Sequence, residues 1–368
     1  MRLVYLLTSL GIGGAERQAT ALAQRMARRG HAAALLVLRA RQAEQWTTEL
    51  ETVYLDMGKS PGSLLAGMLA GSRFLRCYRP DLMHTHTFPA NLAGRLLAPF
   101  VPSAQVLSTI HNVYEGGWQC DLAYRLSDSL SVVTTAVSQA VAEHAIQAKA
   151  VPAQKCRVVP NGIDTAVFQP NAERRLAMRA SMDAFGEFVW LAAGRIVPAK
   201  DYPTLLHAFA RVRQEFPEAR LWIAGEAAPG AKERMRVETA AADVFHEVRW
   251  LGLRRDLPAL LDAADGFVLS SAWEGMPLVV GEAMAMEKPV AATAVGGVRE
   301  LLDDSGIVVP AHSAPRLAEA MLALMQRPAA ERRVLGQAAR RRIEDWFSME
   351  ATADRWEKLY LKVLASKR

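Results

Sequence analysis

The sequence contains few cysteines and no long apolar run, and both absences restrict the kind of protein that it encodes. Its 368 residues include three cysteines, Cys77, Cys120 and Cys156, which lie far apart. They form neither a disulfide framework nor a metal-binding pair, so we expect a reducing compartment. No apolar stretch approaches the roughly 20 residues that a membrane-spanning helix needs.

The first residues also lack the pattern of a signal peptide. A single arginine precedes the short apolar stretch Leu3–Leu7, which runs into glycine-rich turn residues without a small-residue cleavage site. This pattern favours a first strand over a secretory signal. We therefore expect a cytoplasmic protein, and leave open whether it attaches peripherally to the inner face of the cytoplasmic membrane.

Charge of one sign is only mildly in excess. The formal net charge is +6, and the lysines and arginines are spread through the chain. Because nucleic-acid binders gather basic residues in recognisable motifs, we expect no nucleic-acid partner. The excess suits either anionic lipid and phosphorylated substrates or an ordinary solvated surface. The composition, 51% hydrophobic and 22% charged residues, predicts a folded protein. The length of 368 residues suits two domains.

The chain opens with a strand, a glycine-rich loop and a helix. Residues 2–7 read as a buried strand, residues 15–29 as a helix ending at Gly30, and residues 33–38 as a second strand. The loop resembles the dinucleotide fingerprint, but Glu16 stands where its third glycine belongs. Gly13 and Gly14 therefore either let backbone approach a phosphate or sugar, or shape a tight turn.

The same pattern restarts after a polar, arginine-rich segment, residues 165–187, which we expect to be a linker. A strand over 188–193 leads into a loop with Arg195 and Lys200, which either bind a diphosphate or are solvated surface cations. Two successive patterns of this kind predict an α/β fold of two Rossmann-like, doubly wound domains facing across a cleft. We place them at residues 1–165 and 188–345.

Several histidines follow predicted strands of the first half. Residues 81–86 form a short strand ending in His84 and His86, which lack a third ligand for a metal and are expected to hydrogen-bond near the strand end. The strand over 106–110 delivers His111 and Asn112 to a loop that continues to Trp118. His111 either orients or deprotonates a hydroxyl, or it is a structural histidine.

The segment from Pro61 to Tyr78 reads as a helix with apolar and basic residues. Its leucines and arginines allow two interpretations, docking on anionic lipid or packing on the core.

Two carboxylates stand eight positions apart in the second half. An apolar strand over 265–270 leads to Glu274, and a turn with Gly275 and Pro277 leads into a helix that carries Glu282. The N-terminus of that helix offers free backbone N–H groups to an anion such as a phosphate. We expect one acid near a reacting sugar and the other near ribose hydroxyls.

Together these motifs resemble the retaining glycosyltransferases of family 4, which have the GT-B architecture of two Rossmann-like domains. The most specific match is the Glu-x7-Glu element from Glu274 to Glu282. Weaker matches are Gly13-Gly14-Ala15-Glu16, Pro160-Asn161-Gly162-Ile163-Asp164, Gly194-Arg195 with Lys200, and Gly296-Gly297 with Glu300. The resemblance covers nearly the whole chain.

The resemblance implies a role for each matched residue. Arg195 and Lys200 would bind the donor diphosphate, Glu282 the ribose, and Glu274 the donor sugar. His111 would lie near the reacting centre, and residues 346–368 would cross back to the first domain. Further donor contacts would come from Gly13, Gly14, Gly275, Met276, Pro277 and Leu278. On the acceptor side we place His84, His86, Asn112 and Trp118.

The family activity would be transfer of a hexosyl group from a nucleotide sugar, with UDP expected as the carrier, to a glycan or lipid-linked acceptor of surface polysaccharide or lipopolysaccharide type. No cofactor and no divalent metal are expected, because cations and a helix N-terminus supply the electrostatic stabilisation. The alternatives are a non-catalytic partner subunit, an oxidoreductase and a sugar-nucleotide epimerase.

Two residues depart from the family pattern. Asp201 follows Lys200, and Glu287 lies between Met286 and Lys288, at positions where glycine is usual. We expect Asp201 to alter the shape of its loop, and Glu287 to affect a turn and not the chemistry.

Overall fold

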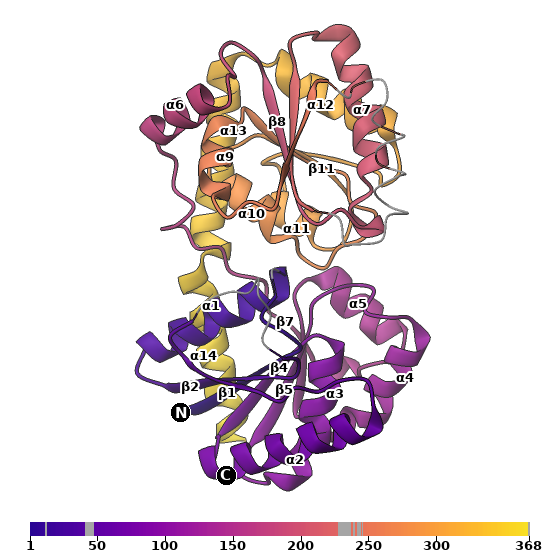
Figure 1. Ribbon diagram of the computed structural model, residues 1–368, viewed down its shortest axis with the longest axis vertical. Coiled ribbons are helices and arrows are strands. Elements are labelled where there is room, and N and C mark those ends of the chain that lie inside the picture. Colours follow the sequence, from indigo (N-terminus) through magenta and orange to yellow (C-terminus); the bar gives the residue numbers. More distant parts are fainter. Residues whose placement is uncertain are drawn as a thin grey trace. The chain divides into compact units, whose positions relative to one another are not determined.

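The chain forms two compact units. The computed structural model describes residues 1–11, 13–40, 48–226 and 246–366, together with Val237, Ala240 and Val244. Unit 1 comprises Met1–Gly162 and Met349–Arg368, and unit 2 comprises Ile163–Ser348 (Figure 1). Each unit is a parallel sheet with helices on both faces, so the α/β class and the two Rossmann-like domains are confirmed.

Unit 1 contains a seven-stranded sheet in the order β3-β2-β1-β4-β5-β6-β7. Its strands are β1 (Arg2–Leu7), β2 (Ala32–Val37), β3 (Glu51–Tyr54), β4 (Leu82–His86), β5 (Gln105–Ile110), β6 (Val133–Ala136) and β7 (Cys156–Val158). Its helices are α1 (Gly14–Arg28), α2 (Pro61–Tyr78), α3 (Phe88–Leu97), α4 (Trp118–Ser127), α5 (Gln139–Gln147) and α14 (Met349–Ala365). The expected first strand, glycine loop, helix and second strand are all present.

Two apolar layers hold this sheet between its helices. On one face, Leu22 and Met26 of α1 and Trp356 of α14 pack with Tyr5 of β1. On the other face, side chains of α2 and α3 pack against alternate positions of the same strands. The alternation follows from the two-residue period of a strand, which points successive side chains to opposite faces.

Unit 2 contains a six-stranded sheet in the order β10-β9-β8-β11-β12-β13. Its strands are β8 (Val189–Ala193), β9 (Arg220–Ala224), β10 (Val248–Gly252), β11 (Gly266–Leu269), β12 (Val290–Thr293) and β13 (Ile307–Val309). Its helices are α6 (Ala172–Ser181), α7 (Tyr202–Glu215), α9 (Leu257–Ala263), α10 (Leu278–Ala285), α11 (Val298–Leu302), α12 (Ala314–Gln326) and α13 (Ala329–Arg342).

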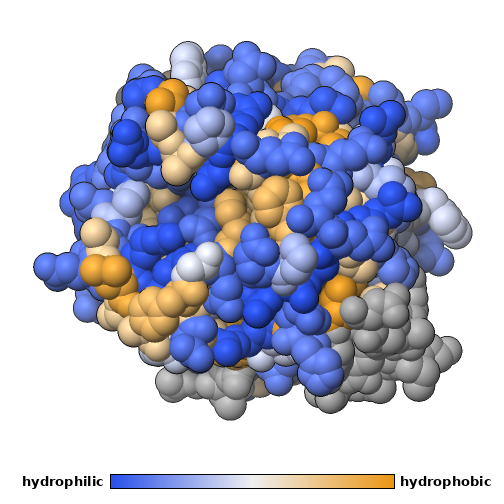
Figure 2. Space-filling view, turned by 90° about the horizontal axis from the view of Figure 1, so that it is seen from above, coloured by the Kyte–Doolittle hydropathy of each residue, from blue (hydrophilic) through white to orange (hydrophobic). Residues whose placement is uncertain are grey.

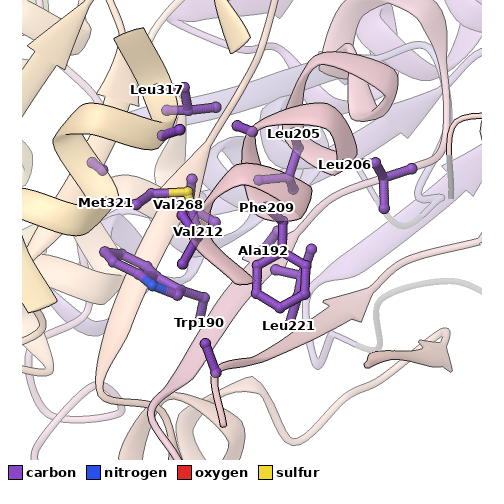
Figure 3. Close-up of a cluster of buried hydrophobic side chains, with 14 of the residues drawn as sticks. Trp190, Ala192, Leu205, Leu206, Phe209, Val212, Leu221, Val268, Leu317 and Met321 are labelled. Carbon is purple, nitrogen blue, oxygen red and sulfur yellow. The ribbon is translucent and has the colours of Figure 1, made fainter. Parts of the chain in front are cut away.

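The core of unit 2 lies between its sheet and helices α7 and α12. Figure 3 shows Trp190 of β8, Phe209 of α7, and Leu317 and Met321 of α12 within this cluster. These four side chains are fully buried. The surface in Figure 2 is mostly hydrophilic, and its hydrophobic residues form small separate groups.

The segment that we expected to be a linker belongs to unit 2. Helix α6 lies within residues 165–187, and its Arg174 forms an ion pair with Asp262, which is buried on α9. Arg179 of the same helix pairs with Asp265. The structure therefore corrects the domain boundary: the second unit begins near Ile163, and α6 packs on α9 with its arginines paired to Asp262 of α9 and to Asp265 just after it.

In each sheet the strand order reverses at one point, where strands that are earlier and later in the sequence are added on opposite sides. In unit 1 this switch lies between β1 and β4, and in unit 2 it lies between β8 and β11. Ligands of doubly wound sheets bind at the carboxyl ends of the strands beside such a switch. The glycine loop follows β1, Lys200 follows β8, and Glu274 follows β11.

Candidate active site

The centre of the unit 2 site is an ion pair between Lys200 and Glu274. The Lys200 ammonium lies 2.5 Å from Oε1 of Glu274, and both side chains are largely buried. Ser271, fully buried, donates its hydroxyl to the same oxygen at 2.7 Å. Glu274 is thus held in one orientation by a cation from one loop and a hydroxyl from its own loop.

Hydrogen bonds to backbone join the two loops that carry this pair. Ser270 donates its hydroxyl to the carbonyl of Lys200 at 2.8 Å, and the Ala272 N–H donates to the carbonyl of Ala199 at 2.8 Å. The Thr293 hydroxyl, from the end of β12, donates to the carbonyl of Ser271. Three neighbouring strand ends therefore support one rigid platform.

The glycine pair after β12 closes against the backbone of Glu274. Gly296 adopts φ +51°, a left-handed conformation that favours glycine, and a Cβ there would overlap the carbonyl oxygens of Glu274 and Gly275. The Gly297 N–H donates to the Gly275 carbonyl at 2.7 Å. The Gly296-Gly297 motif is therefore needed for the shape of this loop.

Helix α10 begins immediately beyond this platform. Pro277 occupies its N-cap, and Leu278 is the first helical residue. Met276, Pro277 and Leu278 are buried, and Glu282 is 2% exposed within the helix. The backbone N–H groups of its first turn make this end of the helix electropositive, shortly after Glu274 in the chain.

Two further charged residues, Arg195 and Asp201, stand on either side of Lys200 in the chain. Arg195, in the loop after β8, is exposed. Asp201, in a left-handed conformation with φ +45°, accepts hydrogen bonds from the N–H and hydroxyl of Thr204 and caps α7. Its carboxylate also lies 2.8 Å from Nδ1 of His312. His312 gave no signal in the sequence because nothing in its own segment points to Asp201.

In unit 1 the glycine loop lies at the switch between β1 and β4. Gly13 is the N-cap of α1, and its N–H donates to the Gly11 carbonyl at 2.8 Å. The hydroxyls of Thr8 and Thr87, which follow β1 and β4, lie 2.8 Å apart. The Glu16 carboxylate lies over Gly13, where a Cβ would have to displace it.

The structure brings His84, His86 and His111 together at the ends of β4 and β5. His84 is fully buried, with Nδ1 2.6 Å from the Tyr360 hydroxyl and Nε2 2.7 Å from the Thr109 hydroxyl. His86 is 2% exposed, and its Nδ1 lies 2.9 Å from Nε2 of His111. Both rings are enclosed by protein, and the acceptor-side position that we expected for His84 and His86 stays a prediction.

Burial shifts the ionisation of this cluster. It lowers the pKa of His111 to about 4 and holds the pKa values of His84 and His86 well below their usual range. All three rings are thus neutral at neutral pH. Within the described parts of the chain, no group of three or more His, Cys, Asp and Glu side chains is placed to hold a metal ion.

Glu115 is a site residue that the sequence did not reveal. Its Oε1 accepts the backbone N–H of His111 at 3.0 Å, and its Oε2 accepts the Tyr124 hydroxyl at 2.7 Å. Burial raises the pKa of Glu115 to about 7. The one available signal was a carboxylate between a strand-end histidine and a glycine pair.

Asn112 and Trp118 occupy the same loop and the start of α4. The Asn112 side chain accepts the Tyr114 N–H, so it shapes the turn. Trp118 is 71% exposed and is followed on α4 by exposed Leu122 and Leu126. The tryptophan is available to a ligand, whereas the asparagine is partly engaged by its own loop.

Lys200 and the N-terminus of α10 supply positive charge, and Glu274 supplies a fixed carboxylate, at the switch point of a doubly wound sheet. Together they define a site for an anionic, hydroxyl-bearing ligand. Family models match both halves of the chain: residues 12–167 match Glycosyltransferase Family 4, and residues 187–327 match Glycosyl transferases group 1. The chain belongs to this family of glycosyltransferases.

Similar proteins of established activity agree with this family. The chain is 30% identical to D-inositol 3-phosphate glycosyltransferase of Saccharomonospora viridis over 85% of this chain and 78% of that protein. It is 32% identical to MMP alpha-(1->4)-mannosyltransferase of Mycolicibacterium hassiacum over 62% of this chain, but spans only 54% of that protein. It is 23% identical to UDP-Gal:alpha-D-GlcNAc-diphosphoundecaprenol alpha-1,3-galactosyltransferase of Escherichia coli over 80% and 79% of the two chains.

Solved structures show the same fold. Sucrose-phosphate synthase from Thermosynechococcus elongatus matches with a TM-score of 0.86 and 23% identity over both whole chains. HepE of Anabaena, solved with UDP, matches with a TM-score of 0.82 and 21% identity over 98% of this chain and 100% of that one. The protein is a glycosyltransferase of GT-B fold, and the oxidoreductase and epimerase alternatives are not supported.

Proposed function

We propose that the protein is a retaining, metal-independent glycosyltransferase that transfers a hexosyl group from a UDP-sugar to a glycan or lipid-linked acceptor. The observation that carries this proposal is the Lys200–Glu274 pair, fixed beside the N-terminus of α10 at the switch point of the second sheet. A site of this kind combines positive charge for a diphosphate with a carboxylate for sugar hydroxyls.

The proposal assigns a role to each donor contact. Arg195 and Lys200 bind the diphosphate and offset the negative charge that grows on the leaving nucleotide, which is the electrostatic task of a metal ion in other transferases. The backbone from Gly275 to Leu278 supports the phosphates through the α10 N-terminus, and Glu282 holds the ribose. The proposal also includes Gly13 and Gly14 as contacts to the diphosphate or the acceptor.

Glu274 accepts hydrogen bonds from the hydroxyls of the donor sugar. Its Oε1 is already bound by Lys200 and Ser271, and a carboxylate oxygen that accepts two hydrogen bonds is a weaker nucleophile than a free one. This favours attack by the acceptor on the leaving-group face, with retention of configuration, over a double displacement through Glu274.

His111, Asn112 and Trp118 serve the reacting sugar and the acceptor. His111 keeps part of its surface exposed, and its backbone is fixed by Glu115. The exposed apolar row of Trp118, Leu122 and Leu126 suits an acceptor that is partly apolar. The Escherichia coli relative acts on a diphosphoundecaprenol-linked sugar, which supports a lipid-linked acceptor in surface polysaccharide or lipopolysaccharide biosynthesis.

A membrane-associated acceptor also suits the surface of α2. Its buried face uses small residues, Gly67 and Gly71, while Leu64, Leu65 and Leu69 are exposed. No helix within the described residues is long and apolar enough to span a membrane. We include in the proposal that α2 docks on anionic lipid at the inner face of the membrane, with Arg73 and Arg76 near the headgroups.

The test is a screen of UDP-, GDP- and ADP-sugars for slow hydrolysis and for transfer to lipid-linked and free sugar acceptors. Glu274→Gln and Arg195→Ala should each lower kcat/KM for the UDP-sugar by about a hundredfold or more. Glu319→Gln and Arg316→Ala, which alter an exposed pair on α12, are the matched controls. Full turnover in both site variants, or a preference for another nucleotide, would contradict the assignment.

Lipid docking is tested separately by sedimentation with anionic and neutral vesicles. Leu65→Glu should reduce binding to anionic vesicles, whereas Leu361→Glu, at an exposed leucine of α14, is the control. Equal binding by both variants would remove the membrane surface from the proposal without affecting the transferase activity.

A further inference from the structure

The imidazoles of His86 and His111 share one hydrogen bond. His86 Nδ1 and His111 Nε2 lie 2.9 Å apart, and the two rings are tilted by 41°. Both rings are neutral at neutral pH, so each carries one proton, which sits on one of its two nitrogens. The hydrogen bond can therefore run in either direction, and the direction determines what the other nitrogen of His111 offers to a ligand.

The surroundings of His86 distinguish the two directions. Its Nε2 is buried and finds no hydrogen-bond partner among the described residues. If His111 donated, the proton of His86 would sit on this Nε2 as a buried, unpaired N–H group. If His86 donates from Nδ1, Nε2 keeps only an unpaired lone pair. An orphaned buried donor is the rarer and costlier arrangement in folded proteins.

The neighbouring ring of His84 offers no hydrogen-bond partner to Nε2 of His86. His84 lies 4.0 Å from His86 between ring centroids, but both of its nitrogens are already paired, with the hydroxyls of Tyr360 and Thr109. The ring of Tyr5 stacks near His86, and its hydroxyl bonds to that of Tyr360. The polar groups on this side of His86 are therefore directed at one another.

We propose that His86 is a positioning residue that sets the tautomer of His111, by donating from Nδ1 to Nε2 and so keeping the His111 proton on Nδ1. The His111 Nδ1 makes no hydrogen bond to the described part of the chain, and this side chain is partly exposed. It then presents an N–H group and no lone pair to a ligand.

This arrangement decides between the two roles that the sequence left open for His111. A ring with its proton on Nδ1 and its Nε2 occupied can orient a hydroxyl or phosphate oxygen by donating a hydrogen bond, but it has no free nitrogen with which to remove a proton. The inference rests on the proposed function, because the proposed function places His111 at the reacting sugar.

Nitrogen-15 NMR of the full chain, labelled at histidine, reports the tautomer without any substrate. The wild-type protein at pH 7 should show His111 protonated at Nδ1, with its signals assigned by their loss in His111→Gln. A ring protonated at Nε2 would overturn the inference, even if the enzyme transferred sugar as proposed.

Two substitutions at His86 then test the link to activity. His86→Asn retains an N–H donor near the position of Nδ1, and should keep both the tautomer and kcat/KM within about threefold. His86→Leu removes the donor, and should shift the His111 proton toward Nε2 and lower kcat/KM about tenfold or more. His207→Asn, at an exposed position on α7, is the control.

The outcomes separate this inference from the proposed function. Loss of activity in His86→Leu with restoration in His86→Asn supports the positioning role. A changed tautomer with unchanged kcat/KM in His86→Leu overturns it while the transferase assignment stands. If His86→Leu does not fold, the wild-type spectrum and the His86→Asn variant still decide the direction of the hydrogen bond.

Discussion

The ammonium of Lys200 and the carboxylate of Glu274, 74 positions apart in the sequence, lie 2.5 Å from each other where two neighbouring strands of the second sheet end. The pair is largely buried, so each charge stabilises the other while no ligand is bound. A donor diphosphate and sugar would bind to groups that are already oriented, which lowers the cost of ordering them on binding.

A double-mutant cycle should show the coupling of this pair. Lys200→Met and Glu274→Gln each leave one partly buried charge without its partner, and should lower the free energy of unfolding by about 1–2 kcal/mol. The double variant should lose less than the sum of the two, yet remain inactive. Urea unfolding followed by fluorescence measures the cycle, and strict additivity would contradict direct pairing.

Glu115 should make the protein less stable as the pH rises. Its pKa is about 7 in the folded state against an ordinary value near 4.5, so the folded state holds a proton that the unfolded chain releases. Its contribution to stability is present below pH 4.5 and is lost as the pH rises through 7. In the wild type this should lower the free energy of unfolding by about 1–2 kcal/mol over this range, a value reduced because the side chain is partly exposed. Glu115→Gln should abolish this decrease.

His111 should have the opposite effect on stability in an overlapping pH range. Its pKa is about 4 in the folded state against an ordinary 6.5, so the unfolded chain binds the extra proton between these values, and stability rises with pH. His111→Gln should flatten this rise by about 1–2 kcal/mol, with the remaining rise due to His84 and His86.

The two effects partly cancel between pH 4.5 and 6.5 in the wild type. Urea unfolding at several pH values should therefore show a steeper rise in Glu115→Gln and a shallower or falling curve in His111→Gln. Identical pH profiles for the wild type and both variants would show that neither pKa is shifted as the burial of these groups implies.

Glu287 should be a position where glycine stabilises the protein. Its φ is +57°, a left-handed conformation that costs a residue with a side chain about 1–2 kcal/mol. Glu287→Gly should raise the free energy of unfolding by about 0.5–1 kcal/mol, because the strain that it relieves exceeds the extra entropy that glycine has in the unfolded chain. Glu287→Ala keeps the strain and should gain nothing, and an equal gain in both variants would exclude the backbone as the cause.

Much of the fold could be predicted, because each strand, glycine loop and helix has its own local pattern. The two departures from glycine, Asp201 and Glu287, were also visible in the sequence, and both adopt positive φ in the structure. How the chain tolerates Asp201 was not visible. Its carboxylate caps α7 and binds His312, and such compensating contacts come from residues that are distant in the chain.

Less of the site could be predicted. We expected His84 and His86 to hydrogen-bond near a strand end on the acceptor side, but the structure buries both rings, and Tyr360 of α14 binds His84 from 276 positions away. Glu115 looked like a loop acid, and only the fold of α4 over that loop brings Tyr124 to its carboxylate. Local patterns carry no information on which side chain from another element will cover a group.

The sequence by itself determined the two α/β units, the loops at their strand ends and the family, because strand and helix periodicity, turn glycines and motif spacing are local properties. The tertiary structure alone decided which of those residues meet. The order of the strands brings β8 beside β11 and β4 beside β5, and so pairs Lys200 with Glu274 and His86 with His111. Sheet order results from the packing of the whole unit, which no short stretch of sequence specifies.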